Sequence, residues 1–268
     1  MKPVAEKGFL IVAINRPECN YVSCAELLAK SIRYYHPDVE IGLLTNDPVP
    51  NPELFTQIRS FPYALVDNAF ANDWQVFHAT PFRETIKLEA DMLITHHVDH
   101  WWTLLRNRDI VISTGCRDWQ DREASARHYR QVFDENQLPD VYNAITYWRR
   151  SETAQEFFQT VRAIFENWEQ YRALLKFPEA MPSTDVVYAM AAKIIGPERC
   201  TMPFASYPQI VHMKRHIIAS EREKWQDELL WEYNDYILRV ESIAQLRPFH
   251  YHRKEWAKDL EKQWDGND

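Results

Sequence analysis

The chain has 268 residues, of which 46% are hydrophobic and 26% charged, a composition typical of a globular protein with enough apolar material for a core. Its net charge of −8 argues against general nucleic-acid binding, so any contact with DNA or RNA would need a local basic patch. Only five glycines occur, and the chain contains neither GxGxxG nor GxxxxGK[ST], which argues against dinucleotide-binding and P-loop folds.

The first 45 residues predict a strand, a helix and a second strand. Phe9–Ile14 (FLIVAI) is a short, branched apolar run typical of a buried parallel strand, and it is too short for a signal peptide or a membrane span. Tyr21–Tyr35 has apolar residues at helical spacing, and Val39–Thr45 (VEIGLLT) is again strand-like. This order indicates a βαβ unit and therefore an α/β fold.

Five further segments follow the proline-rich loop after the second strand. Pro81–Leu88 predicts a short helix or turn, whereas Ile110–Ser113 and the aromatic run Val141–Trp148 predict strands. Ser151–Trp168 is an amphipathic helix with Ser151 as its N-cap, and Thr184–Ile195 is a second helix. The tryptophan-bearing tail after residue 220 is expected to pack back on the same domain. The four cysteines lack CxxC spacing, so reduced thiols in a cytoplasmic protein are expected.

The stretch KLEADMLITHHVDHWW holds two acids one residue apart, Glu89 and Asp91. On an extended segment, side chains at positions i and i+2 point the same way, so both acids can reach one cation. Their oxygen atoms suit Mg²⁺ or Mn²⁺, and such an ion typically also binds phosphate. The alternative is a pair of ordinary surface acids.

The same stretch contains three histidines, His96, His97 and His100. Their HHxxH spacing lacks the glutamate of the HExxH zinc motif, and further ligands would have to come from elsewhere. We therefore interpret this part as a structural turn that packs on the core.

The order of these features resembles the GT-A glycosyltransferases, most closely the family 8 type, which includes glycogenin and lipopolysaccharide galactosyltransferases. FLIVAINRPECNYVSCAELLAKSIRYYHP is similar to the opening strand and helix of that family, which hold uracil. The resemblance places Asn15 and Tyr21 at the base, with Ala13 lining its pocket. Tyr21 could instead be an aromatic side chain that packs on the core.

Glu89-Ala90-Asp91 takes the place of the family's DxD motif, which binds Mn²⁺ and through it the diphosphate of the sugar nucleotide. Glutamate replaces the usual first aspartate, so the resemblance favours Asp91 as the safer ligand and leaves direct coordination by Glu89 open. Arg83 and Lys87, just before the pair, are expected to add positive charge.

VYNAITYW and TDVVYAM are similar to two family segments that line the donor sugar and the acceptor. Asn143 and Asp185 are the residues that the resemblance carries over, as catalytic or sugar-orienting groups. Ala144 departs from the family's serine, and Asp185 could equally be a first-turn acid of its helix.

FHYHRKEW resembles the family's H-(Y/F)-x-G-x-x-K-P-W motif, in which the histidine is the third metal ligand and the lysine meets the diphosphate. His250, Lys254 and Trp256 fit these roles. The spacing is two residues shorter and the glycine is missing, which leaves His252 as a rival ligand.

The resemblance implies a single GT-A domain over residues 1–268, a mostly parallel sheet flanked by helices. It has a nucleotide-binding half at 1–115 and an acceptor half with a closing segment at 116–268. The implied activity is transfer of a sugar from a UDP-sugar, or another nucleotide sugar, to an acceptor hydroxyl, with Mn²⁺ or Mg²⁺ and with retention of configuration. A degenerate GT-A module that only binds nucleotide sugar, and a sugar-phosphate nucleotidyltransferase, are the alternatives. A weaker likeness to sugar-nucleotide transferases of tailed phages suggests one acceptor, a hydroxymethylated pyrimidine in phage DNA, and location in the host cytoplasm.

Overall fold

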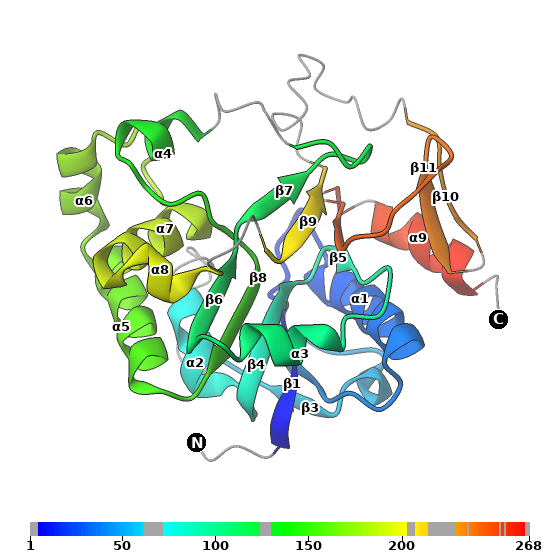
Figure 1. The fold of residues 1–268 in the computed structure, drawn as a ribbon. Coiled ribbons are helices and arrows are strands. Elements are labelled where there is room, and N and C mark those ends of the chain that lie inside the picture. Colours follow the sequence, from blue (N-terminus) through cyan, green and yellow to red (C-terminus); the bar gives the residue numbers. More distant parts are fainter. Residues whose placement is uncertain are drawn as a thin grey trace.

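The computed structural model describes residues 5–61, 72–123, 130–202, 207–213, 229–234, 236–251, 253–254 and 256–265. Its centre is a six-stranded sheet with the strand order β3-β2-β1-β4-β8-β6 (Figure 1). The strands are β1 (Ala5–Val12), β2 (Ile41–Leu44), β3 (Gln57–Arg59), β4 (Phe82–Glu89), β6 (Ile110–Ser113) and β8 (Tyr142–Arg149). The first four are parallel to one another, and β8 is antiparallel to both of its neighbours. The sheet is therefore mostly parallel.

The expected βαβ unit is present at the N-terminal end. Helix α1 (Tyr21–Tyr35) connects β1 to β2, and the side chain of its N-cap Asn20 accepts a hydrogen bond from the Ser23 backbone at 3.1 Å. Phe9 and Ile11 of β1 pack in one core cluster and Leu10 packs in another. Since side chains alternate along a strand, these two clusters cover the two faces of the sheet.

Helices cover both faces (Figure 1). The cluster that contains Leu10 is formed with buried residues of α5 (Glu152–Glu166) and α7 (Thr184–Ile195), and the opposite cluster with α1 and α9 (Trp256–Asp265). The shorter helical segments are η1 (Pro52–Leu54), α2 (Val76–Ala79), α3 (His100–Leu105), α4 (Gln131–Glu135), α6 (Trp168–Leu175) and α8 (Pro197–Cys200). None of the helices within the described residues combines the length and the apolar character that a bilayer crossing requires.

Two small sheets complete the fold. One has the order β5-β13-β9-β7, formed by β5 (Met92–Leu93), β13 (Phe249–His250), β9 (Gln209–His212) and β7 (Gly115–Arg117). The other is formed by β10 (Trp231–Asn234), β11 (Ile237–Val240) and β12 (Ile243–Ala244). Helix α9 packs against α1 and β10, so the described part of the tail returns to the domain as expected.

The prediction for Pro81–Leu88 was wrong. This segment is not a helix or turn but lies in β4, which pairs with β1 on one side and β8 on the other. The segment has no alternation of apolar and polar residues, because Glu84 and Lys87 are buried in it and are paired with other polar side chains. Glu84 accepts a hydrogen bond from Tyr147 and pairs with Arg106, whereas Lys87 pairs with Asp73.

Candidate active site

A cavity of about 250 Å³ opens at the carboxyl ends of β1 and β4. These strands are parallel neighbours, so their ends lie at the same edge of the sheet, where α/β folds bind ligands. Val12 and Ile14 line it at and just after the end of β1, and Glu89 and Asp91 line it at and just after the end of β4. The acid pair is therefore part of a cavity wall rather than of an open surface.

Strand pairing brings His250 to the acid pair from the far end of the chain. In the antiparallel pairing of β13 with β5, His250 lies opposite Met92, and the Tyr251 backbone N–H donates to the Asp91 carbonyl at 3.2 Å. His250 Nε2 lies 3.0 Å from Asp91 Oδ2, and its Nδ1 lies 3.5 Å from Glu89 Oε2. Glu89, Asp91 and His250 offer three ligand atoms that all lie within 4.8 Å of one another.

Lys254 completes this group. Its Nζ lies 2.8 Å from Asp91 Oδ2, and the Asp91 side chain is only 6% exposed. Burial alone would raise the pKa of Asp91, but His250 and Lys254 outweigh it, and the pKa lies well below its usual value. Burial likewise works to lower the pKa of Lys254, yet Asp91 holds it above the ordinary value. Both side chains are therefore charged at neutral pH.

The donor set fits a divalent cation. Two carboxylates and an imidazole on a short loop and an adjacent strand suit Mg²⁺ or Mn²⁺, with positions left for phosphate oxygens. Burial raises the pKa of Glu89, and the neighbouring Asp91 charge adds to this effect against the opposing effect of His250. Two carboxylates held this close repel each other, and a cation between them relieves that repulsion.

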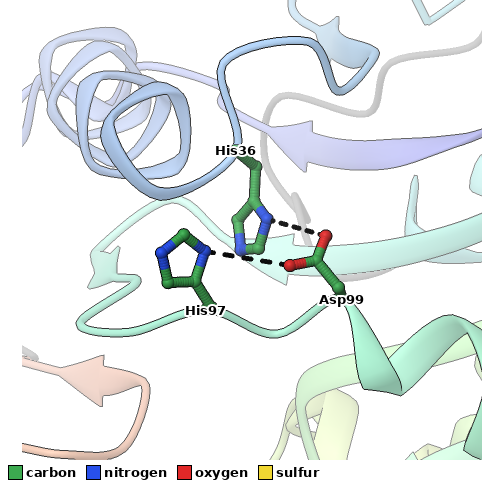
Figure 2. Close-up of side chains that lie close together, drawn as sticks. All are labelled: His36, His97 and Asp99. Atoms are coloured by element: carbon green, nitrogen blue, oxygen red, sulfur yellow. Dashed lines mark hydrogen bonds and ion pairs between the residues drawn. The ribbon is translucent and has the colours of Figure 1, made fainter.

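A second cluster of possible ligands also has one ligand atom of each residue within 4.8 Å of the others: His36, His97 and Asp99 (Figure 2). His36 Nε2 accepts a hydrogen bond from the Val98 backbone at 3.1 Å, so the proton of its neutral ring is on Nδ1, 3.2 Å from Asp99 Oδ1. Neither nitrogen of His36 then has a lone pair for a metal. His36 is also the C-cap residue of α1, and its contacts tie that helix to the segment before α3. This cluster is a structural connection.

The buried wall of the cavity, here called its floor, is a polar network of Lys87, Asp73, Asn143, Asp185 and Tyr188, of which the sequence predicted three residues. Lys87 Nζ donates to Asp73 Oδ1 at 2.6 Å and to Asn143 Oδ1 at 2.9 Å. The Tyr188 hydroxyl donates to the other oxygen of Asp73. The Asn143 backbone N–H donates to Asp185 Oδ1 at 2.7 Å. Lys87, Asn143 and Asp185, all predicted site residues, therefore lie together at the floor.

Arg130 holds Asp185 from behind the cavity. Its guanidinium donates to Asp185 Oδ2 at 2.9 Å, to Asp140 Oδ1 at 2.9 Å and to the Val141 carbonyl at 2.8 Å. It also lies over the Tyr142 ring at 3.7 Å. Asp185 is thus both a first-turn acid of α7 and a cavity residue. Asp73, Tyr188 and Arg130 were missed because no local motif marks them.

The mouth of the cavity contains Tyr21, with Lys254 Nζ at 5.8 Å and the Arg16 guanidinium at 5.9 Å from its ring centre. Asn15 lies beside this region. Its side chain accepts from the Val22 backbone at 3.0 Å, and its own backbone N–H donates to Asp47 at 2.8 Å. Ala13 is fully buried just after β1, and neither Ala13 nor Asn15 is among the described residues that line the cavity.

Two predicted residues lie away from the cavity. Arg83 lies at the start of β4, whereas the cavity lies at the carboxyl end of that strand. It is exposed, and its Nε lies 3.9 Å from Glu6 Oε2. Trp256 packs against Trp231, with 5.0 Å between the ring centroids, and does not line the cavity. His252, the rival ligand, lies outside the described residues.

No protein-family model and no curated protein matches the chain. Among solved structures, mouse xyloside xylosyltransferase 1 has a TM-score of 0.52 at 12% identity, over 92% of this chain and 98% of that one. The galactosyltransferase LgtC, in complex with donor and acceptor sugar analogs, has a TM-score of 0.49 at 13% identity, over 96% and 94%. The likeness to the xylosyltransferase confirms the expected α/β fold of the GT-A type.

Proposed function

We propose that the chain is a metal-dependent glycosyltransferase that moves a sugar from a nucleoside-diphosphate sugar, with UDP as the expected nucleotide, to an acceptor hydroxyl. The observation that carries this proposal is the meeting of Asp91, Glu89 and His250 in one cavity, with Lys254 on the same carboxylate. The histidine and the lysine come from the opposite end of the chain, so the group is not a chance pair of neighbouring acids. The fold shared with a xylosyltransferase supports the same class.

The residues of the mouth and of the metal site would bind the donor. Asp91 and His250, with Glu89, would hold Mn²⁺ or Mg²⁺, which supplies Lewis-acid stabilisation of the leaving diphosphate. Lys254 is positioned beside Asp91 to place a positive charge on the same diphosphate as the bond to the sugar breaks. Tyr21 offers an aromatic face for the base at the mouth of the cavity.

The floor residues would bind the sugar. Asn143 and Asp185 line the cavity and are fixed by Lys87 and Arg130, so little reorganisation is needed when sugar hydroxyls bind. Asp185 lies where a carboxylate can orient a hydroxyl or stabilise an oxocarbenium-like sugar. We propose retention of configuration from the family resemblance alone, and the product anomer measured by NMR tests it.

A thermal shift assay tests the binding part of the proposal. Ligand at about 100 times its Kd adds about 2.7 kcal/mol to the folded state, which is about 5 to 10 °C for a chain of this size. We expect UDP with Mn²⁺ to give such a shift and EDTA to remove it. Asp91→Asn and His250→Ala should lose it, whereas the matched control His97→Ala should keep it. A wild-type protein with no metal-dependent shift for UDP or another nucleoside diphosphate would refute the proposal.

An assay of transfer separates an enzyme from a binding module. Incubation with UDP-sugars should release UDP, and release should increase with the right acceptor. Binding without any release would instead indicate a nucleotide-sugar-binding module. The acceptor hypothesis is a hydroxymethylated pyrimidine in phage DNA. Mass spectrometry of hydroxymethylcytosine DNA after incubation tests it, with unmodified DNA as the control.

A further inference from the structure

The backbone of Arg16 is fixed by a tight turn between β1 and α1. The Arg16 N–H donates to the Cys19 carbonyl at 2.9 Å, and the Cys19 N–H donates back to the Arg16 carbonyl at 3.0 Å. Asn20, the next residue, is the N-cap of α1. The turn therefore leads directly into α1, and from it the Arg16 side chain lines the cavity.

Arg16 and Lys254 lie near the same ring. Both cationic groups are within 6 Å of the Tyr21 ring centre, so they are at most about 12 Å apart. Lys254 also contacts Asp91 at 2.8 Å. Lys254 therefore links the metal site to Tyr21 and Arg16 along the cavity wall.

The charge of the cavity favours a phosphate contact for Arg16. Among the described residues that line it, four are carboxylates (Asp73, Glu89, Asp91 and Asp185) and three are cations (Arg16, Lys87 and Lys254). Lys87 is held at the floor by Asp73 and Asn143. A bound dication would change the net charge of the cavity from about −1 to +1, which suits a diphosphate. Without Arg16 this positive balance would disappear. A guanidinium also matches phosphate oxygens in a two-point contact.

We propose that Arg16 binds phosphate oxygens of the nucleotide donor, as a second cationic contact beside Lys254. This inference rests on the proposed function, since it needs a nucleotide in the cavity. It adds a binding residue from the NRPECN turn.

Isothermal titration with Mn²⁺ present tests the inference on the full chain, with UDP and uridine as the probes. We expect Arg16→Ala to raise the Kd for UDP about 10- to 100-fold, the loss expected for a charge-assisted hydrogen bond, and to leave the Kd for uridine unchanged. Arg16→Lys should recover part of the UDP affinity, because it keeps the charge but loses the fork geometry. Arg83→Ala, an exposed arginine at the far end of β4, is the matched control and should bind UDP like wild type.

The outcomes separate this inference from the proposed function. If wild type binds UDP and Arg16→Ala binds it equally well, Arg16 makes no phosphate contact and only this inference is overturned. Equal losses for UDP and uridine would show that Arg16 acts on the base, which also overturns it. If wild type binds no nucleotide, both proposals are wrong. Unchanged urea unfolding of Arg16→Ala checks that the variant is folded.

Discussion

Replacement of Arg130 by methionine should destabilise the protein by about 3 kcal/mol. Arg130 is only 1% exposed and makes hydrogen bonds to two carboxylates and a backbone carbonyl. Breaking a buried ion pair by removing one partner costs about 3–5 kcal/mol. The side chains of Asp140 and Asp185 are 38% and 21% exposed, so water can partly replace the lost contacts. We therefore expect a loss at the lower end of that range. Methionine keeps apolar contact with the Tyr142 ring.

Urea unfolding and a melting curve measure this effect. A loss of about 3 kcal/mol corresponds to a fall of Tm of about 6 to 12 °C in a chain of this length. Arg83→Met, which removes an exposed arginine, should change the free energy of unfolding by less than about 0.5 kcal/mol. If Arg130→Met lost no more stability than Arg83→Met, the buried ion pairs of Arg130 with Asp140 and Asp185 would not stabilise the fold.

Three further predictions concern single contacts. Burial lowers the pKa of His36 below 6.5, against the opposing effect of Asp99. The free energy of unfolding should therefore be highest above pH 6.5 and should fall as the pH drops below that value. His36→Gln should flatten this dependence between about pH 7 and 5, measured by urea titrations. Lys87→Met removes the cation that pairs with Asp73 and should lower the free energy of unfolding by about 3 kcal/mol; adding Asp73→Asn should restore part of that loss, measured as a double-mutant cycle. Glu89→Gln should weaken Mn²⁺ binding about 10- to 100-fold in calorimetry if Glu89 only orients His250, and a total loss would instead make it a ligand.

Local patterns were enough to predict the first two strands and the helix between them. The βαβ unit follows from local sequence, because β1 and β2 contain short continuous apolar runs and α1 has apolar residues at helical spacing. β4 could not be predicted in this way. Glu84 and Lys87 are buried there, and their partners come from distant segments, so the polar letters of PFRETIKL gave no strand pattern.

In the candidate site, too, the residues that a sequence motif marks could be predicted, and those that depend on distant partners could not. Glu89, Asp91, His250 and Lys254 could be predicted, because their order along the chain matched a family pattern. The floor network could not, since Asp73 meets Tyr188 across 115 residues and Arg130 meets Asp185 across 55. Such contacts are set by the packing of helices on the sheet, and nothing in the sequence near either residue records its partner.

The two histidine-carboxylate clusters show why proximity alone does not define a metal site. Both bring three possible ligand atoms within 4.8 Å. In His36 Nε2 accepts a hydrogen bond from the Val98 backbone N–H, so the proton of the neutral ring is on Nδ1. In His250 Nε2 lies 3.0 Å from Asp91 and Nδ1 lies 3.5 Å from Glu89, so each ring nitrogen faces a carboxylate with which it could share a cation. The hydrogen bond from the Val98 backbone therefore marks His36 as a structural histidine, whereas the ring of His250 lies between two possible co-ligands.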